Sequence, residues 1–225
     1  VIVNHGGHRT SEDVFATCAL FAHNGFVTIA CNLRHGEVPL PYDWIDGEET
    51  WEEGMGPGTS EENIRRLQES IEILKSLEYV DSKKIAIYGH SMGGHLTVGY
   101  LALANKDKDV KVGAITSAGI YPKNPEEFKN SKWLEIIKMI SPEAEAIRNI
   151  EVPFLIIHGR RDRTCPVECA MTLKEELDKH NKVSILKIHD DEGHGVNHHQ
   201  GVFEEISLFY RKHLPLPESP IKKLD

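Results

Sequence analysis

The stretch YGHSMGGH, residues 88–95, places one serine among three glycines at the end of an apolar run. The pattern Gly-x-Ser-x-Gly between a strand and a helix is typical of a nucleophile elbow, a sharp turn that projects the serine hydroxyl. Glycines flank such a serine because side chains there would collide with the neighbouring strand and helix. A plain Gly-rich connection has the same composition, so the rest of the chain decides between the two interpretations.

Around this stretch, short apolar runs alternate with segments of helical periodicity. The runs contain few polar residues, as expected of strands that are buried on both faces of a parallel sheet. We therefore predict an α/β fold with a doubly wound, mostly parallel sheet. The expected strands are residues 1–4, 26–31, 84–89, 112–119, 153–159 and 183–189. The expected helices are residues 11–24, 60–78, 92–104, 167–180 and 198–213.

Two of the expected helices carry further local signals. In the segment 60–78 the apolar residues recur every three or four positions, and Thr59 with Glu62 forms a possible capping box at its start. In the segment 11–24 one apolar face is expected. Its members are Val14, Phe15, Cys18 and Phe21.

The 225 residues fit one domain, 1–225, with two long connections. Residues 34–58 form an acidic, aromatic connection, and residues 120–150 form a cap-like insertion between two strands. Long connections in compact domains are often binding loops or lids. Three aromatic residues of the first connection are predicted to wall a substrate pocket, unless that loop packs on itself: Tyr42, Trp44 and Trp51.

Composition excludes some classes of function. The formal net charge of −9 argues against a nucleic-acid-binding face, which needs clustered basic residues. No run approaches the roughly 18 apolar residues of a membrane span. The four cysteines match no zinc or disulfide framework, which favours reduced thiols and a cytoplasmic protein. The chain opens inside an expected strand, which leaves open whether further residues precede Val1.

Chemically useful residues follow several of the expected strands. His5-Gly6-Gly7 follows the first strand, Ser91 the third, Asp162 the fifth and His194 the sixth. The carboxyl ends of parallel strands meet at one edge of the sheet, where ligand sites of open α/β sheets lie. A serine, an acid and a histidine are therefore expected to come together.

A serine hydroxyl needs a general base, and His194 suits this role because Gly193 and Gly195 flank it in a loop. The alternative is an ordinary surface histidine. Asp162 is the expected acid that orients the base, unless it only caps the following helix. Asp190 and Asp191 lie too close to His194 in the sequence for the usual arrangement.

The remaining polar residues near the serine receive other roles. The amides of Gly7 and Met92 are expected to form an oxyanion hole, with His8 as the alternative to Gly7 and as an expected substrate contact. We interpret His90 and His95 as packing or supporting residues, and Cys165 as structural. His198 and His199 lack acidic or cysteine partners at metal-ligand spacing, so no metal is expected and the chemistry requires no cofactor.

These motifs resemble those of the α/β-hydrolase superfamily over nearly the whole chain. GHSMGG with its extra glycine, HGRRDRTCP and DEGHG resemble the serine, acid and histidine loops of prolyl-oligopeptidase-like and dienelactone-hydrolase-like enzymes. The resemblance implies that Ser91, Asp162 and His194 are nucleophile, acid and base. The family sheet usually has eight strands, so six implies a minimal or truncated version. The chain has no room for the β-propeller of the prolyl oligopeptidases, which favours an esterase.

The sequence thus predicts a serine carboxylesterase that acts on a small-molecule ester through an acyl-enzyme. A small serine peptidase, or an acyl-thioester hydrolase or transferase of the same fold, is the alternative. A binding protein on a hydrolase scaffold is the third interpretation, because a fold does not by itself establish an activity.

Overall fold

The computed structural model of the protein describes residues 1–7, 11–33, 61–128, 133–199 and 201–214. Six strands form one sheet in the order β2-β1-β3-β4-β5-β6, and every neighbouring pair is parallel. This arrangement confirms the predicted α/β fold with a parallel sheet. The strands are β1 (Ile2–Asn4), β2 (Ile29–Cys31), β3 (Ile85–His90), β4 (Val110–Thr116), β5 (Phe154–Gly159) and β6 (Ser184–His189).

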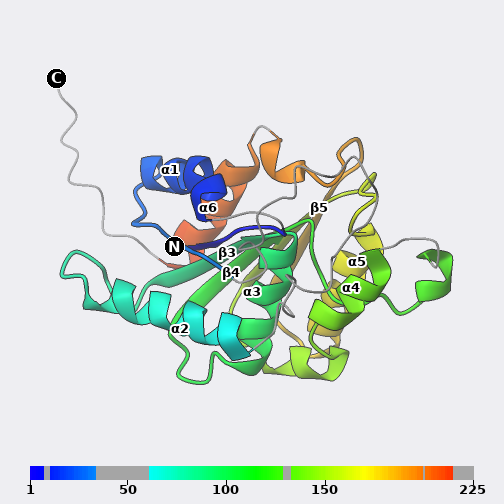
Figure 1. Ribbon diagram of the computed structural model, residues 1–225, viewed down its shortest axis with the longest axis horizontal. Coiled ribbons are helices and arrows are strands. Elements are labelled where there is room, and N and C mark those ends of the chain that lie inside the picture. The colour runs from blue at the N-terminus through cyan, green and yellow to red at the C-terminus, as the bar shows by residue number, and fades with distance from the viewer. Residues whose placement is uncertain (8–10, 34–60, 129–132, 200, 215–225) are drawn as a thin grey trace, which may run out of the picture.

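Helices cover both faces of this sheet (Figure 1). The helices are α1 (Phe15–His23), α2 (Glu61–Ser76), α3 (Met92–Leu103), α4 (Trp133–Ile140), α5 (Val167–Lys179) and α6 (Val202–His213). Side chains of α1 and α6 pack on one face, and those of α2, α3 and α5 pack on the other. The described residues also form short 3-10 helices: η1 (Ser11–Val14), η3 (Pro125–Phe128), η4 (Ala144–Asn149) and η5 (Val196–His198).

Strand β5 illustrates how the apolar runs hold the two layers together. Successive side chains of a strand point to opposite faces of the sheet. Phe154 and Ile156 accordingly join the core under α3 and α5, whereas Leu155 and Ile157 join the core under α1 and α6. All four side chains are buried, which explains why this strand has no polar alternation.

The first helical segment differs from its prediction. The chain is a 3-10 helix over Ser11–Val14 and becomes α-helical only at Phe15. Val14 and Phe21 are buried as expected, but the placement of Phe15 on the buried face is wrong, since its side chain is 76% exposed. Consecutive residues of a helix lie about 100° apart, so Phe15 turns away from the sheet when Val14 faces it.

The bounds of other elements also differ from those predicted. The second strand is shorter than residues 26–31, and the last helix begins at Val202 instead of 198. Gly201 precedes that helix with φ of 89°, a conformation that favours glycine. Thr59 of the proposed capping box lies outside the described residues, as does the connection 34–58. Among the helices that the structure describes, none has the length and apolar character needed to cross a membrane.

Candidate active site

Ser91 lies in the sharp turn between β3 and α3. Its backbone has φ of 54° and ψ of −123°, a strained combination for a residue with a side chain. Such strain costs about 1–3 kcal/mol and persists where the surroundings fix the backbone. Here the Ser91 amide donates to the Thr116 carbonyl at 3.0 Å, and the Ser91 carbonyl accepts from the His95 amide at 3.0 Å.

The glycines beside Ser91 are required by close contacts of the main chain. A Cβ atom on Gly89 would lie 2.1 Å from the carbonyl oxygen of Gly93. A Cβ atom on Gly93 would lie 2.4 Å from the carbonyl oxygens of Asn4 and His5, at the end of β1. No real Cβ atom tolerates these distances, so any side chain at either position would force the turn apart.

The structure brings Ser91, His194 and Asp162 together at the carboxyl edge of the sheet. The His194 Nε2 atom lies 3.0 Å from Ser91 Oγ, and its Nδ1 atom lies 2.8 Å from Asp162 Oδ2. His194 follows β6 and Asp162 follows β5, so the sheet places residues far apart in the sequence within hydrogen-bonding distance. The rival Asp190 and Asp191 instead pair on the surface, with Arg160 and Arg161 respectively.

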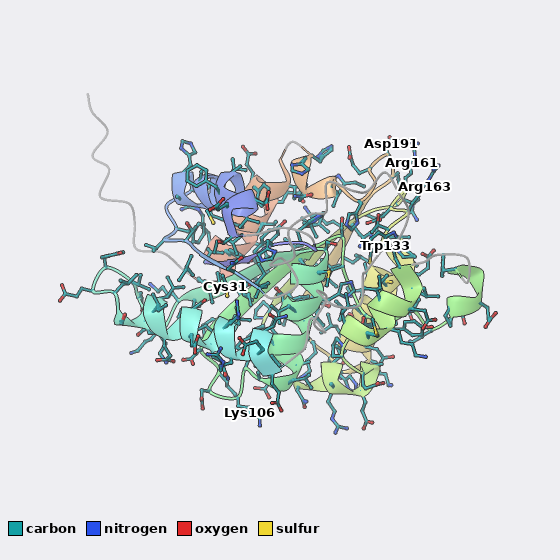
Figure 2. The ribbon with its side chains drawn as sticks, in the orientation of Figure 1. Cys31, Lys106, Trp133, Arg161, Arg163 and Asp191 are labelled. Carbon is teal, nitrogen blue, oxygen red and sulfur yellow. The ribbon has the colours of Figure 1, made fainter. Side chains whose placement is uncertain are left out.

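Figure 2 shows where the pair of Arg161 and Asp191 lies. Arg161, Arg163 and Asp191 gather at the same end of the molecule as Trp133, and Lys106 lies at the opposite side. Because Arg161 follows β5 and Asp191 follows β6, this end is the carboxyl edge of the sheet. Helix α4, which begins at Trp133, therefore lies at the edge that holds Ser91 and His194.

Asp162 is buried and fully hydrogen-bonded. Its Oδ1 atom accepts from the amides of Thr164 and Cys165, each at 2.8 Å. The Nε2 atom of His158 lies 3.3 Å from Asp162 Oδ2 and donates to the Cys165 carbonyl at 2.8 Å. Burial alone raises the pKa of Asp162, but the hydrogen bonds from His158 and His194 outweigh it and hold that pKa well below its usual range.

An ionised Asp162 fixes the state of the histidine. Its carboxylate can only accept, so His194 donates through Nδ1 and presents the lone pair of Nε2 to the Ser91 hydroxyl. The hydroxyl proton can then pass to His194 when Ser91 Oγ attacks an electrophile. The arrangement is thus competent for nucleophilic catalysis.

His90 and His95, expected to pack or support, line the cavity in front of Ser91. Burial, with a smaller contribution from the charge of His194, lowers the pKa of His90 to about 3. Burial also lowers the pKa of His95 to about 3. Both rings therefore stay neutral near pH 7. The Nδ1 atom of His90 lies 3.0 Å from Thr116 Oγ1, which holds the ring in place.

A cavity of about 280 Å³ opens in front of Ser91. The predicted oxyanion residues Gly7 and Met92 both line it, as does Cys165, and a Cβ atom on Gly7 would lie 2.5 Å from Met92 Sδ. Met92 is the first residue of α3, where backbone amides have no helical partner and the helix dipole favours negative charge. The other expected substrate contacts lie outside the described residues: His8, Tyr42, Trp44 and Trp51.

Sequence reasoning missed two residues that support the site. His158 ends the apolar run of β5, and Ser117 follows β4 with φ of 50°. The Ser117 hydroxyl donates to the His194 carbonyl at 2.7 Å. The available signal was the same one that identified the other residues, namely a polar side chain at the carboxyl end of a buried strand.

Comparisons with known proteins identify the family of the chain. The model of the dienelactone hydrolase family matches residues 1–207. The chain belongs to this family. It is therefore an α/β-hydrolase, as the resemblance of its three loops implied. A search among curated proteins found no match.

Solved structures show the same fold at low sequence identity. A Pyrococcus horikoshii acylaminoacyl peptidase has a TM-score of 0.70 at 17% identity, over 98% of this chain and 38% of its own. A Klebsiella pneumoniae protein with a provisional dienelactone hydrolase assignment has a TM-score of 0.71 at 15% identity, over 96% and 86%. A Paleococcus ferrophilus monoacylglycerol lipase has a TM-score of 0.65 at 18% identity, over 94% and 93%. The chain thus spans well under half of the peptidase.

Proposed function

We propose that the protein is a serine hydrolase that cleaves small-molecule carboxylic esters through an acyl-enzyme. The observation that carries the proposal is the position of His194. One ring nitrogen lies 3.0 Å from Ser91 Oγ, and the other lies 2.8 Å from the carboxylate of Asp162. This is the relationship that a general base needs with its nucleophile and its orienting acid.

In the first half-reaction Ser91 Oγ attacks the ester carbonyl carbon while its proton moves to His194 Nε2. Asp162 stabilises the resulting imidazolium, and the amides of Gly7 and Met92, two residues that line the cavity, hold the oxyanion in this proposal. The intermediate then collapses, and the bond to the alcohol oxygen breaks. That oxygen takes the proton from His194, so a neutral alcohol leaves and the acyl group stays on Ser91.

In the second half-reaction water replaces the alcohol. His194 accepts a proton from the water, and the hydroxide oxygen forms a bond to the acyl carbon. When the bond to Ser91 Oγ breaks, His194 returns the proton to the serine. The products are a carboxylic acid and the original enzyme, so the cycle needs only the side chains already described.

Two printed names support an ester as the substrate. The family model is that of dienelactone hydrolases, and a lactone is a cyclic ester. A solved structure of the same fold is a monoacylglycerol lipase, and a monoacylglycerol is also an ester. We therefore assign the ester as the substrate class, with peptidase and thioesterase activity as the alternatives that the experiment must separate.

The experiment combines Ser91→Ala with a panel of p-nitrophenyl esters, acyl thioesters and aminoacyl amides. Loss of the nucleophile should lower kcat by roughly four to six orders of magnitude. Ser76→Ala, at an exposed position on α2, serves as the matched control and should leave kcat unchanged. Undiminished turnover by the Ser91 variant would overturn the assignment.

The panel also distinguishes the alternatives. A higher kcat/KM for thioesters or amides than for oxyesters would retain the serine mechanism and reject the ester assignment. A fluorophosphonate probe should label Ser91 in the native protein. If the probe fails to label it and no substrate turns over, the chain is a binding protein on this scaffold.

A further inference from the structure

We propose that helix α4 is the acyl-binding wall of the site and that it selects esters of uncharged, apolar acyl groups of short to medium length. This inference rests on the proposed function and adds its substrate class. It follows from the described side chains that line the cavity in front of Ser91, and from the charges that are absent among them.

Helix α4 presents one apolar face to the cavity. The side chains at its positions i, i+3, i+4 and i+7 lie on one side of a helix. In α4 these residues all line the cavity: Trp133, Ile136, Ile137 and Ile140. Glu135, Lys138 and Met139 point to solvent, so the helix divides into a cavity face and an exposed face.

The same helix is held firmly against the rest of the site. Ile137 packs with Cys165 and Cys169 in a small hydrophobic cluster separate from the two main cores, and Trp133 packs against that cluster. Cys165 donates its amide to Asp162, so the contact fixes α4 relative to the loop that carries the acid. The wall therefore lies at a set distance from Ser91 and His194.

No side chain that is charged at neutral pH lines this cavity among the residues that the structure describes. Its titratable groups other than His194 are His90, His95 and Cys165. Both histidines have a pKa of about 3. A hydrogen bond with Cys169, together with burial, raises the pKa of the Cys165 thiol well above its usual value. A charged acyl group would lose its hydration without gaining a charged partner among these described residues, which therefore disfavour it.

The volume sets the scale of the acyl group. A cavity of about 280 Å³ is about twice the ~150 Å³ of an engineered apolar cavity that holds one benzene molecule. After room for the ester itself, that space suits a chain of roughly four to eight carbons. Each methylene buried against α4 should raise kcat/KM about fourfold, until the cavity is full.

A second cavity explains why α4 is assigned to the acyl group and not to the alcohol. It has a volume of about 560 Å³ and shares Gly6 and His90 with the first. Asn197, His198 and His199 line it, and they lie three to five residues after His194 in the chain. Because His194 protonates the departing oxygen, we assign this second cavity, which the residues after His194 line, to the alcohol.

The test uses two ester series on the full chain. One keeps p-nitrophenol and lengthens the acyl group from acetate to dodecanoate; the other keeps acetate and varies the alcohol. Ile136→Trp places a bulky ring in the cavity at a half-buried position, and Met139→Trp places the same ring on the exposed face of α4 as control. A third comparison sets p-nitrophenyl butyrate against p-nitrophenyl hydrogen succinate, whose acyl group ends in a carboxylate.

The native protein should show the highest kcat/KM between butanoate and octanoate and should favour butyrate over hydrogen succinate at least a hundredfold. Ile136→Trp should lower kcat/KM for octanoate at least tenfold and change acetate less than threefold, whereas Met139→Trp should change neither. Three outcomes would overturn the proposal. Ile136→Trp could lower kcat/KM equally for acetate and octanoate, or it could change kcat/KM only in the alcohol series. The native protein could also hydrolyse butyrate and hydrogen succinate at equal rates. Labelling of Ser91 by fluorophosphonate separates such a result from failure of the serine mechanism itself.

Discussion

The side-chain hydroxyl of Ser117 donates a hydrogen bond of 2.7 Å to the main-chain carbonyl of His194. Ser117 follows β4 and His194 follows β6, so this bond reaches past β5, the strand between them. Ser117 is completely buried, has φ of 50° and donates its amide to the Ile157 carbonyl at 3.1 Å. A strained serine thus fixes the main chain of the proposed base.

Replacing Ser117 should reduce the rate without weakening substrate binding. Ser117→Ala leaves the His194 carbonyl without its donor, so the imidazole is held less well and kcat should fall about tenfold at unchanged KM. Ser117→Gly removes the same hydroxyl but relieves the positive φ. Steady-state kinetics and urea unfolding measure the two effects. Equal kcat for native protein and Ser117→Gly would show that the hydroxyl has no positioning role.

The choice of acid can be tested by comparing two aspartates. Asp162→Asn removes the charge that holds the His194 tautomer, and kcat should fall about 10⁴-fold. Asp190→Asn alters an exposed residue that pairs with Arg160, and it should change kcat less than twofold. Both are measured on the same p-nitrophenyl ester. The reverse order of effects would mean that the wrong aspartate was assigned.

Stability should fall as the medium becomes acidic below about pH 6.5. The folded pKa values of His90 and His95, near 3, lie below the ordinary value of 6.5, so the unfolded chain binds protons that the folded chain cannot. The stabilisation is therefore complete above pH 6.5 and is lost progressively toward pH 3, with a slope of up to about 1.4 kcal/mol per pH unit for each histidine.

Urea unfolding at pH 7.5, 6, 5 and 4 measures this slope. His90→Gln should lower the slope of unfolding free energy against pH by the contribution of about one bound proton. His23→Gln, at an exposed position of α1, should leave that slope unchanged. A free energy of unfolding that stays constant from pH 6.5 to pH 5 would contradict the neutral, buried state of the two rings.

Removing the strain at the elbow should stabilise the protein. Glycine tolerates the backbone of Ser91, with φ of 54° and ψ of −123°, better than any residue with a side chain. Ser91→Gly should therefore be about 1–2 kcal/mol more stable than Ser91→Ala, although both are inactive. Thermal unfolding of the two variants provides the comparison. A less stable glycine variant would show that the turn is not strained.

The need for glycine at position 94, the extra glycine of the serine loop, should come from a single neighbour, Ala118. A Cβ atom on Gly94 would lie 2.4 Å from the Cβ of Ala118. Gly94→Ala should therefore lower the free energy of unfolding by about 1–3 kcal/mol. Adding Ala118→Gly removes the clashing atom and should restore much of that loss, more than the two single changes predict together. Simple additivity in urea unfolding would refute the contact.

The parallel sheet, the sharp serine turn and the order of serine, acid and histidine could be predicted from the sequence. Each depends on local features: an apolar run forms a buried strand, and the Gly-x-Ser-x-Gly pattern indicates a strand-to-helix turn. Parallel strands then bring their carboxyl ends together whatever their order in the sheet, so the edge that carries the site was also predictable. The prediction that Phe15 is buried was wrong, because the spacing of apolar residues locates the edge of a buried helix face only to within one residue.

The tertiary structure alone decided how those residues contact one another. The bonds of Ser117 and His158, the surface pairing of Asp190 and Asp191, and the face that α4 turns to the cavity all depend on distances between segments far apart in the chain. Such contacts leave no periodic trace in the sequence, because a hydrogen bond needs only two suitable atoms about 3 Å apart. The folding of the sheet and its helices sets that distance.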